Sequence, residues 1–467
     1  MGTIRRISEN VLKHDPQAQQ ELPEAVRRNL PGNALRIIGA TALQNSGDQV
    51  VKASTVLPWL FHALGVPSAL VGLLVPIRES GSMLPQAFIT PFVLRVRRRK
   101  WVFVIGAIVQ AATVAAMAVV AAFADGLLAG VLILVALAVF SLGRSLCSIS
   151  SKDVLGRTVP KGTRGQINGL STMSAGIVAI PLGLVLRLVG GGDPPIWMLV
   201  VLLASGSALW VLTALVYSGV REPAGEDADQ FVSDESAPDK SAPVKSVPDG
   251  REDGSAQDEP PALSAGLKTA VTLLRDDVPF RRFVTMRSLL LVSALSPPFV
   301  ITLAVSSGAG ALSGLGGFII ASGLSAVVGG PVFGRIADRA SRTLMAVGAG
   351  VASLTLVVML VVSGLPGFDG GTVWGASVFV TTYFVLTFVH TGVRVGRKTY
   401  IVDMAKGDQR TNYVAVSNSA MGVILLVAGG ISSLLALWGV EWALVFLAAL
   451  GFLGVIVAAR LPDVSVR

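Results

Sequence analysis

Four charged side chains lie inside long apolar segments near the start of the sequence, where ionisable groups are costly. They are Asp48, Lys52, Arg78 and Glu79. A charged group at the centre of a membrane-spanning helix costs about 2.5–3.5 kcal/mol on the insertion scale, so it faces protein or water rather than lipid. Carboxylates and cations in such surroundings either form fixed salt bridges between helices or exchange a proton and bind a polar solute. We keep both interpretations open and treat the four residues as candidate proton-binding or solute-binding groups.

The spacing of these residues indicates which of them can meet. Spacings of three and four place Asn45, Asp48 and Lys52 on one stripe of a helix. Lys52 lies about 14 residues before the turn expected between the first two apolar segments, and Glu79 lies about 13 residues after it. At a rise of about 1.5 Å per residue, both sit about 20 Å from that turn. We therefore expect a Lys52–Glu79 bridge to be possible, with Asp48 within reach of Lys52 or Arg78.

Other polar candidates are spread over the later apolar segments. They are Gln86, Arg144, Arg287, His390 and Arg394. Apart from Glu441 near one end, the apolar segments of the second half contain no acid that balances these arginines. A vestibule with surplus positive charge attracts an anionic solute, whereas arginines near segment ends can also extend their charge to the membrane interface. His390 either titrates near neutral pH or is a packed core histidine.

The composition shows which elements must position these groups. Of the 467 residues, 52% are hydrophobic and only 14% are charged, against about 25% charged in an ordinary soluble domain. This excludes a water-soluble enzyme and a disordered chain, and it predicts a membrane protein with many spans. A single cysteine, Cys147, and three scattered histidines argue against a metal or cysteine-based site, so we expect no metal and no cofactor.

Twelve apolar segments are long enough to cross a bilayer, which takes about 20 residues each. They cover roughly 35–63, 68–94, 101–123, 126–150, 164–190, 196–219, 283–306, 312–334, 343–363, 372–395, 413–437 and 441–459. Because backbone amides in lipid must bond internally, the segments are read as helices. The sequence therefore predicts an all-α membrane protein with twelve transmembrane helices.

An acidic stretch divides the spans six and six. Residues 221–262 contain 12 acids, 4 bases and six prolines, a composition typical of a disordered linker, and 263–276 repeat apolar positions at helical spacing, as a helix lying on a membrane surface does. The domain organisation predicted is an N-terminal segment 1–33, a bundle 34–220, a linker with its helix 221–281, a second bundle 282–460 and a tail 461–467.

The distribution of Lys and Arg predicts the orientation. The even-numbered connections carry clusters such as Arg97 to Lys100, while the odd-numbered ones carry almost none. Since cytoplasmic loops are enriched in Lys and Arg, both termini are expected in the cytoplasm, with the chain in the cell (inner) membrane. The basic residues form no continuous stripe with aromatics between them, so nucleic-acid binding is rejected.

The two halves repeat a pattern at equivalent places. The second segment ends with Pro91, three residues and Arg95, and the eighth ends with Pro331, three residues and Arg335. The connections after the fourth and tenth segments both run from a basic cluster through Lys-Gly to an arginine and a Ser/Asn-rich helix start. Repeated halves with charged groups near mid-membrane are typical of secondary transporters.

At these residues the chain resembles the major facilitator superfamily, over nearly all of residues 34–460. The most specific match runs from Gly334 through Asp338 and Arg339 to Arg342, similar to the family's loop signature. The resemblance implies two pseudo-symmetric six-helix bundles that rock around a central cavity. It also implies a cytoplasmic gate at this loop, formed by Arg335, Asp338, Arg339 and Arg342, although a solvated loop is the alternative. The first-half loop contains no acid, so the same pairing is not expected there.

We therefore predict a secondary transporter that moves a small organic solute by alternating access, with the proton as coupling ion. Efflux of amphiphilic drugs or metabolites by the same fold is the first alternative, and a non-transporting membrane sensor or scaffold is the second. An enzyme is not expected, because the spans contain no His-Glu-x-x-His motif and no Ser-His pair. The expected partners are the solute, the proton and the lipid bilayer, and the chain is expected to be monomeric.

Overall fold

The structure is a computed structural model that describes residues 24–86, 89, 93, 96–158, 177–188, 195–222, 271–404 and 409–460. Every regular element in these ranges is an α-helix, so the all-α prediction is confirmed. Eight of the described helices are long and apolar enough to cross a membrane, and two shorter apolar helices cover Ile177–Leu188 and Gly314–Gly329. The chain is thus a multi-span helical membrane protein.

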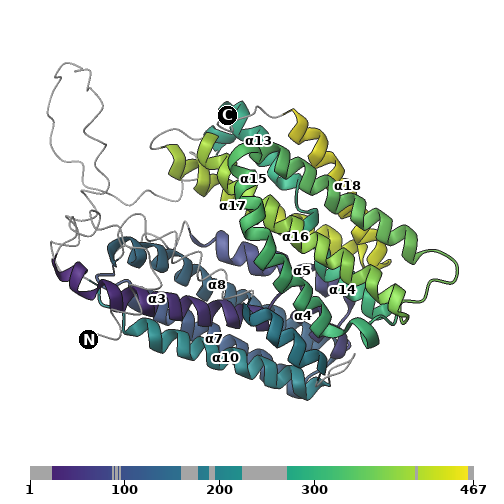
Figure 1. The fold of residues 1–467 in the computed structure, drawn as a ribbon, viewed down its shortest axis with the longest axis horizontal. Coiled ribbons are helices and arrows are strands. Elements are labelled where there is room, and N and C mark those ends of the chain that lie inside the picture. The colour runs from purple at the N-terminus through teal and green to yellow at the C-terminus, as the bar shows by residue number, and fades with distance from the viewer. Residues whose placement is uncertain are drawn as a thin grey trace.

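The helices form two groups, which Figure 1 separates by colour. The first half contains α3 (Glu24–Val50), α4 (Val56–Ala63), α5 (Ser68–Met83), α7 (Lys100–Phe123), α8 (Gly126–Thr158) and α10 (Ile196–Ser218), together with the short helix Ile177–Leu188. The second half contains α13 (Val278–Leu289), α14 (Val292–Ser306), α15 (Gly310–Ser363), α16 (Val373–Met404), α17 (Gln409–Leu435) and α18 (Val440–Ala459). The most extensive helix contacts lie within each half.

Each of the twelve predicted spans contains helix in its described residues, but some boundaries differ. The first helix begins at Glu24, inside the segment expected to precede the bundle. The eighth and ninth spans run together in α15 and are separated only by the non-helical backbone of Ala340, with φ −154° and ψ 56°. The acidic linker and the N-terminal and C-terminal tails lie almost wholly outside the described residues, as does the predicted surface helix apart from helical residues 271–276.

The first span of each half is interrupted near its middle. In the first half, α3 ends at Val50 and α4 begins at Val56. The carbonyl of Lys52 accepts the N–H groups of Thr55 and Val56 at 3.1 and 3.0 Å across this break. Pro58 lies in the first turn of α4, where a missing N–H leaves no helical bond unmade. In the second half, α13 and α14 are separated by residues 290–291, so the interruption lies closer to the turn end in the first half, where α4 has 8 residues, than in the second, where α14 has 15.

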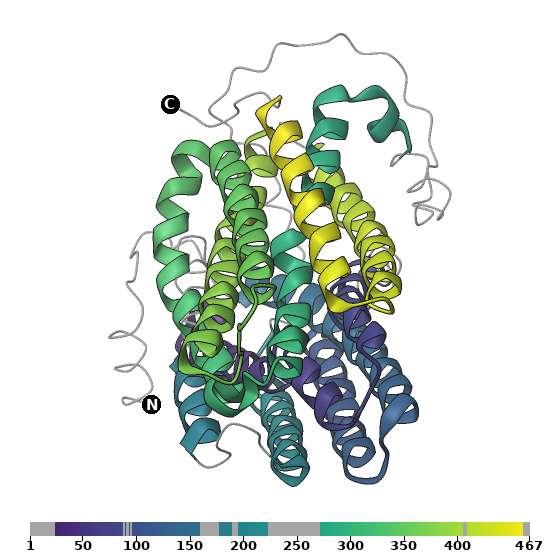
Figure 2. The same ribbon diagram turned by 90° about the vertical axis from the view of Figure 1, so that its right-hand side faces the viewer.

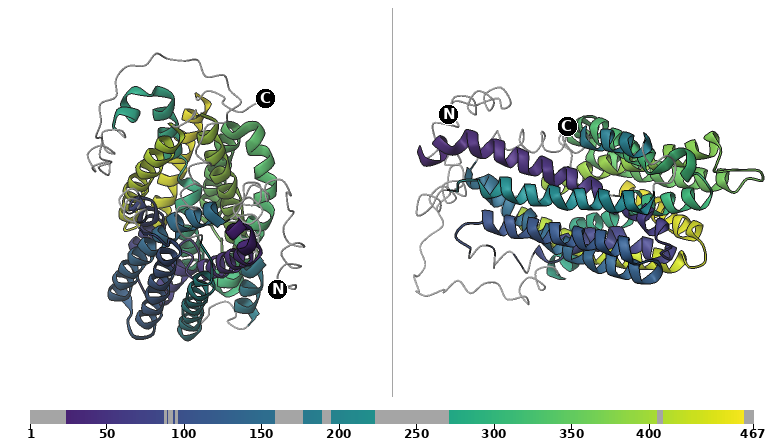
Figure 3. Two further views of the ribbon diagram at one scale, coloured as in Figure 1. Left: turned by 90° about the vertical axis from the view of Figure 1, so that its left-hand side faces the viewer. Right: turned by 90° about the horizontal axis from the view of Figure 1, so that it is seen from below.

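Two ends of the molecule are named here by their residues. At the turn end, the carbonyl of Leu64 accepts the N–H of Gly126, and Ser68 bonds the carbonyl of Ala436. At the linker end lie residues 96–99 and 221–222. There the carboxylate of Glu222 accepts the N–H groups of Arg99 and Lys100, the latter the first residue of α7. The helices of both halves run between these ends, as Figure 2 and the right-hand view in Figure 3 show.

The halves meet mainly where α4 and α5 of the first half pack against α14 and α17 of the second half. These four helices lie at the centre of Figure 1. Small residues allow the close approach: a Cβ on Gly429 of α17 would collide with Pro76 of α5, and one on Gly72 would meet Phe299 of α14. Trp59 of α4 also reaches Phe318 across the interface, with ring centroids 6.4 Å apart. These contacts lie in the turn-end part of the helices.

Candidate functional site

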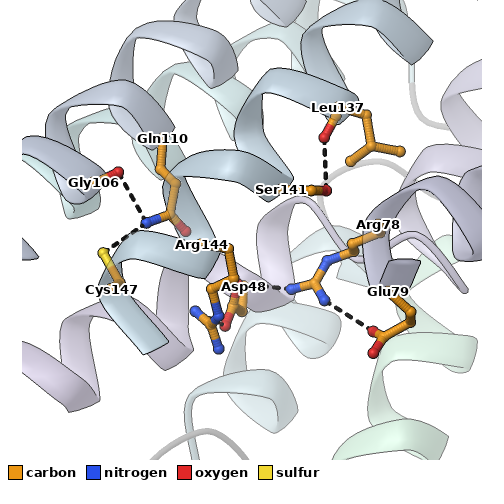
Figure 4. A network of polar contacts seen from close by, with 9 residues as sticks. All are labelled: Asp48, Arg78, Glu79, Gly106, Gln110, Leu137, Ser141, Arg144 and Cys147. Atoms are coloured by element: carbon orange, nitrogen blue, oxygen red, sulfur yellow. Dashed lines mark hydrogen bonds and ion pairs between the residues drawn. The ribbon is translucent and has the colours of Figure 1, made fainter. Parts of the chain in front are cut away.

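Three helices of the first half bring four charged side chains together around Asp48. Arg78 Nη2 lies 2.9 Å from Asp48 Oδ1, and Arg144 Nη1 lies 2.7 Å from Asp48 Oδ2. Arg78 Nη1 also lies 3.2 Å from Glu79 Oε1. Figure 4 shows this group between α3, α5 and α8. We call these four residues the Asp48 network.

An aromatic side chain holds Arg78 in place. Phe140 lies on α8 one turn before Arg144, and the guanidinium carbon of Arg78 sits 5.8 Å from the Phe140 ring centroid. A cation over an aromatic face is attracted by the ring's quadrupole. Phe140 is itself fully buried and packs edge-on against Trp210 of α10. The position of Arg78 is therefore fixed by core packing as well as by its carboxylate partners.

The Asp48 network borders accessible space. The side chains are 13% exposed for Asp48, 18% for Arg78, 27% for Arg144 and 39% for Glu79. Asp48 has two ion-pair partners, whereas Glu79 has one and is the more exposed of the two carboxylates.

The expected bridge between Lys52 and Glu79 is not formed. Glu79 pairs with its chain neighbour Arg78 instead, because the long arginine side chain can turn back along the helix surface. Lys52 lies in the break between α3 and α4, has no carboxylate within ion-pair distance among the described residues, and is within electrostatic range of Arg78 and Arg394. The distances of Lys52 and Glu79 from the first turn predict similar depths, but depth does not determine in which direction the side chains point.

The second half presents arginines to the same central region. Arg287, near the end of α13, is 9% exposed. Its Nη1 donates to Ser417 Oγ and its Nη2 donates to Asn418 Oδ1 at 3.0 Å, both on α17. Its Nε is buried without a partner. Arg394 lies on α16 and is exposed.

The other candidate residues make local contacts. His390 Nδ1 lies 3.3 Å from Ser293 Oγ of α14, next to the interruption of the seventh span. Gln86 Nε2 donates to the carbonyl of Ser82 at 2.7 Å, which holds it along its own helix. Asn45 lies on α3 one turn before Asp48 and is partly buried. Neither His390 nor Gln86 joins the Asp48 network in this conformation.

The predicted gate after the eighth span is placed only in part. The backbone is helical through Arg335, Asp338 and Arg339, while the side chains of these residues lie outside the described parts of the structure. Arg342 is partly buried just beyond the backbone break at Ala340. The gate therefore stays a prediction.

The equivalent first-half loop obtains its acids from elsewhere in the chain. Arg99 forms an ion pair with Asp153 near the end of α8. The carboxylate of Glu222, after α10, accepts the backbone N–H of Arg99 at 2.9 Å, at the positive end of α7. Lys100 Nζ donates to the carbonyls of Ser218 and Val220 at 2.9 and 2.8 Å. Three helix ends are thus tied together although the loop itself contains no acid.

Two groups of residues at the centre were not expected from the sequence. Arg397 follows Arg394 by one turn on α16 and is partly buried with an unpartnered Nε. Arg397 belongs to the basic cluster that follows the tenth apolar segment, and a basic cluster at that place predicts a connection between spans. Thr55, in the first interruption, hydrogen-bonds to Tyr383 of α16, which joins the two halves. A tyrosine in an apolar segment gave no signal that distinguishes this role from core packing.

Comparison with known proteins agrees with the architecture. Residues 39–393 match the sequence profile of the Major Facilitator Superfamily. A search of curated proteins finds no match to the chain. Among solved structures, a POT family transporter in complex with a thioalcohol-conjugated peptide is similar, with 12% identity, a TM-score of 0.64 and coverage of 94% of this chain and 98% of that chain.

Two further solved structures share the fold. A variant of the nucleoside transporter NupG has 12% identity and a TM-score of 0.65, with 92% of this chain and 99% of that chain covered. The inward open xylose transporter XylE from E. coli has 10% identity and a TM-score of 0.61, with 92% of this chain and 96% of that chain covered. At these identities the likeness describes the fold, and the two halves correspond to its two bundles.

Proposed function

We propose that this chain, which belongs to the Major Facilitator Superfamily, is a proton-coupled secondary transporter that moves a small organic solute by alternating access. The observation that carries the proposal is the Asp48 network, in which two carboxylates and two arginines from three helices meet beside accessible space. Ionisable groups at this depth are costly. A wet, alternately opened passage gives a physical reason for keeping them. The similarity to a D-xylose-proton symporter, at 10% identity and TM-score 0.64, supports the fold needed for such a cycle.

The arrangement of the halves supports rocking between two states. Close contacts between them lie toward the turn end, at α4, α5, α14 and α17, and also where Gly183 of the helix Ile177–Leu188 meets Gly316 of α15. Ser80 of α5 donates to the carbonyl of Gly422 of α17 at 2.7 Å, near the level of Glu79. Such packing suits a state closed at the turn end, and separation along this small-residue interface provides the opposite state. The solute site then lies between the halves, beside the Asp48 network.

A proton on Glu79 changes the network in a defined way. Protonation at Oε1 removes the charge that attracts Arg78 Nη1 across 3.2 Å. The guanidinium then pairs with Asp48 alone, which accepts a hydrogen bond from Arg78 Nη2 and forms an ion pair with Arg144 Nη1. The Glu79 side chain is left neutral and can turn away from Arg78 as the halves move. Loss of the proton on the other side of the membrane restores the ion pair, which couples proton movement to the change of state.

We place the chain in the cell (inner) membrane with the linker end in the cytoplasm. Arg99 and Lys100 lie at this end and tie α7 to Asp153 and to the end of α10. The enrichment of Lys and Arg in the connections at this end agrees with the orientation rule for cytoplasmic loops. Both termini are then cytoplasmic.

Proteoliposomes containing a trapped pH-sensitive dye test this proposal. Succinate, xylose, uridine and dialanine are each added to one side, and internal pH and radiolabel uptake are recorded together. We expect one solute class to enter with protons, and Glu79→Gln to abolish the pH change while exchange of solute for solute continues. Glu441→Gln, at the turn-end start of α18, is the matched control and should behave as wild type.

Three outcomes contradict the proposal. Solute entry without proton movement in the wild type removes the coupling. An unchanged pH response in both Glu79→Gln and Asp48→Asn removes the assigned site. Absence of flux for every solute class in either direction favours the sensor or scaffold alternative over transport.

A further inference from the structure

Four cations at the centre of the molecule have no carboxylate partner among the described residues. Lys52 lies in the interruption of the first span, Arg287 lies near the end of α13, and Arg394 and Arg397 lie on α16. None of them forms an ion pair with a described carboxylate, and the two acids nearby are engaged: Asp48 by Arg78 and Arg144, and Glu79 by Arg78. We call the four residues the cation cluster.

Arg287 is a buried cation whose charge is not neutralised by the described residues around it. It is more than nine-tenths buried. Within the described parts of the structure, its two Nη atoms meet only neutral oxygens of Ser417 and Asn418, and its buried Nε has no partner. A buried charge without a counter-ion is strongly unfavourable, because the protein replaces only part of its hydration. Ser417 and Asn418 orient the guanidinium but do not neutralise it. A negatively charged ligand would do so.

The members of the cation cluster act on one another. Lys52 from the first half and Arg394 from the second are within electrostatic range, and so are Arg287 and Arg397. Arg397 also interacts electrostatically with Arg394 and with Glu79 of the opposite half. With Arg78 and Arg144, the described residues of the central region include six cations against two carboxylates. This surplus of four positive charges spans both halves.

The helix interruptions reinforce this placement. Lys52 occupies the break between α3 and α4, and Arg287 lies three residues before the break between α13 and α14. Interrupted helices in repeated halves are where secondary transporters build solute and ion sites. Each half therefore contributes one cation at or close to the interruption of its first span, and α16 adds Arg394 and Arg397, one turn apart.

We infer that the transported solute is an organic anion with at least two negative charges, of the dicarboxylate type, held between the halves by the cation cluster. This inference rests on the proposed function and names its substrate class. Arg287 and Arg397 of the second half bind one carboxylate, and Lys52 with Arg394 binds the other across the interface. Charge-assisted bonds of this kind are short and strong, and an arginine fork matches a carboxylate in a planar geometry. A dianion that contacts both halves also neutralises part of the repulsion that otherwise separates them.

A charge series on one carbon skeleton tests the inference. Succinate, succinamate and succinamide have two, one and no negative charges at neutral pH and nearly the same size. The full chain in phosphatidylcholine nanodiscs is heated with each compound, and apparent affinity is taken from the rise in Tm with concentration. We expect succinate to bind at least about tenfold more tightly than succinamate, succinamide not to bind, and the effect to weaken at high salt.

Variants assign the effect to the cation cluster. Arg287→Gln and Arg397→Gln should each lose the succinate response, whereas Arg287→Lys should retain part of it. Arg187→Gln is the matched control, because Arg187 is an exposed arginine beside an apolar pocket lined by Ile320 and Phe384 and has no ion-pair partner among the described residues. A normal response in both Gln variants, or equal responses to all three compounds, overturns the inference.

The test separates this inference from the proposed function. Proton-coupled flux of a neutral solute, together with no charge-graded binding, removes the anion assignment and leaves the transporter intact. Charge-graded binding that needs Arg287, with no flux of any solute, leaves an anion-binding membrane protein and removes transport. Charge-graded binding together with succinate flux supports both.

Discussion

In the first half of the molecule, Asp48 meets one arginine from α5 and another from α8, whereas in the second half Arg287 meets only neutral oxygens from α17. Asp48 lies in the last turn of α3 and Arg287 in the last turn of α13, so each site lies beside an interruption of the first span of its half. The first is close to internally neutral, while the second has unbalanced positive charge. Two halves of similar architecture therefore hold buried charge in opposite ways.

This difference suggests a division of tasks. The Asp48 network contains its own counter-ions, so the proton exchange that we propose at Glu79 needs no ligand. The second half lacks acids at this level among the described residues, so its arginines favour a state in which an anion is bound. Coupling of proton and anion binding then requires an interaction between the two halves. Arg397, which lies within electrostatic range of Glu79, provides one.

The largest expected effect of a single change is at Asp48. In Asp48→Asn the side chain keeps its size, but Arg78 and Arg144 lose their shared carboxylate. Breaking a buried pair by removing one partner costs about 3–5 kcal/mol, and since these side chains are 13–27% exposed, we expect a loss of about 2–3 kcal/mol after allowing for solvent screening. Denaturant unfolding in detergent micelles measures it.

A matched acid at the surface provides the control for this change. Asp125→Asn removes an exposed carboxylate at the turn end, between α7 and α8, and should change the free energy of unfolding by less than about 0.5 kcal/mol. If Asp48→Asn is as stable as the wild type, the first half does not depend on the Asp48 network, and the contrast between the halves fails.

The second expected effect is smaller and opposite in sign. Arg287→Gln removes a buried charge that has no counter-ion, while the amide can still bond Ser417 or Asn418. We expect the ligand-free protein to become more stable by about 1 kcal/mol, since the recovered desolvation exceeds the lost hydrogen bond. The same substitution at Arg144, which has a carboxylate partner, should lower the stability. Unfolding of both variants without added anion is the measurement, and equal destabilisation by both contradicts the comparison.

Composition and hydropathy were sufficient to predict the helical architecture, because lipid allows few other ways to satisfy the backbone. They also identified Asp48, Arg78, Glu79 and Arg144, since charge inside an apolar segment is conspicuous. The interruptions of the first and seventh spans were not predicted. The second lies in the apolar run 289–292, and in the first neither the polar residues around Lys52 nor Pro58 defines where α3 ends.

The pairing of the charged residues could not be obtained from the sequence. Depth along a hairpin favoured Lys52 with Glu79, but helix rotation decides which side chains face each other, and this depends on packing between distant helices. Arg144 reaches Asp48 from α8, 96 residues further along the chain. The sequence places Arg397 in a basic connection. Positive charge near the end of a span can set the orientation of the chain or bind an anion, and the sequence alone does not distinguish the two.

The central claim is that these charged side chains border water inside the membrane. It is tested most directly by thiol labelling in a Cys147→Ser background, which removes the only cysteine. Ser82→Cys places a thiol one turn after Glu79 on α5, and Val139→Cys places one on the exposed apolar surface of α8 at a similar depth. A charged, membrane-impermeant maleimide should label Ser82→Cys and leave Val139→Cys unreacted, because thiols ionise in water but not in lipid. Failure of Ser82→Cys to react from either side of the membrane, or equal labelling of both positions, would contradict the account.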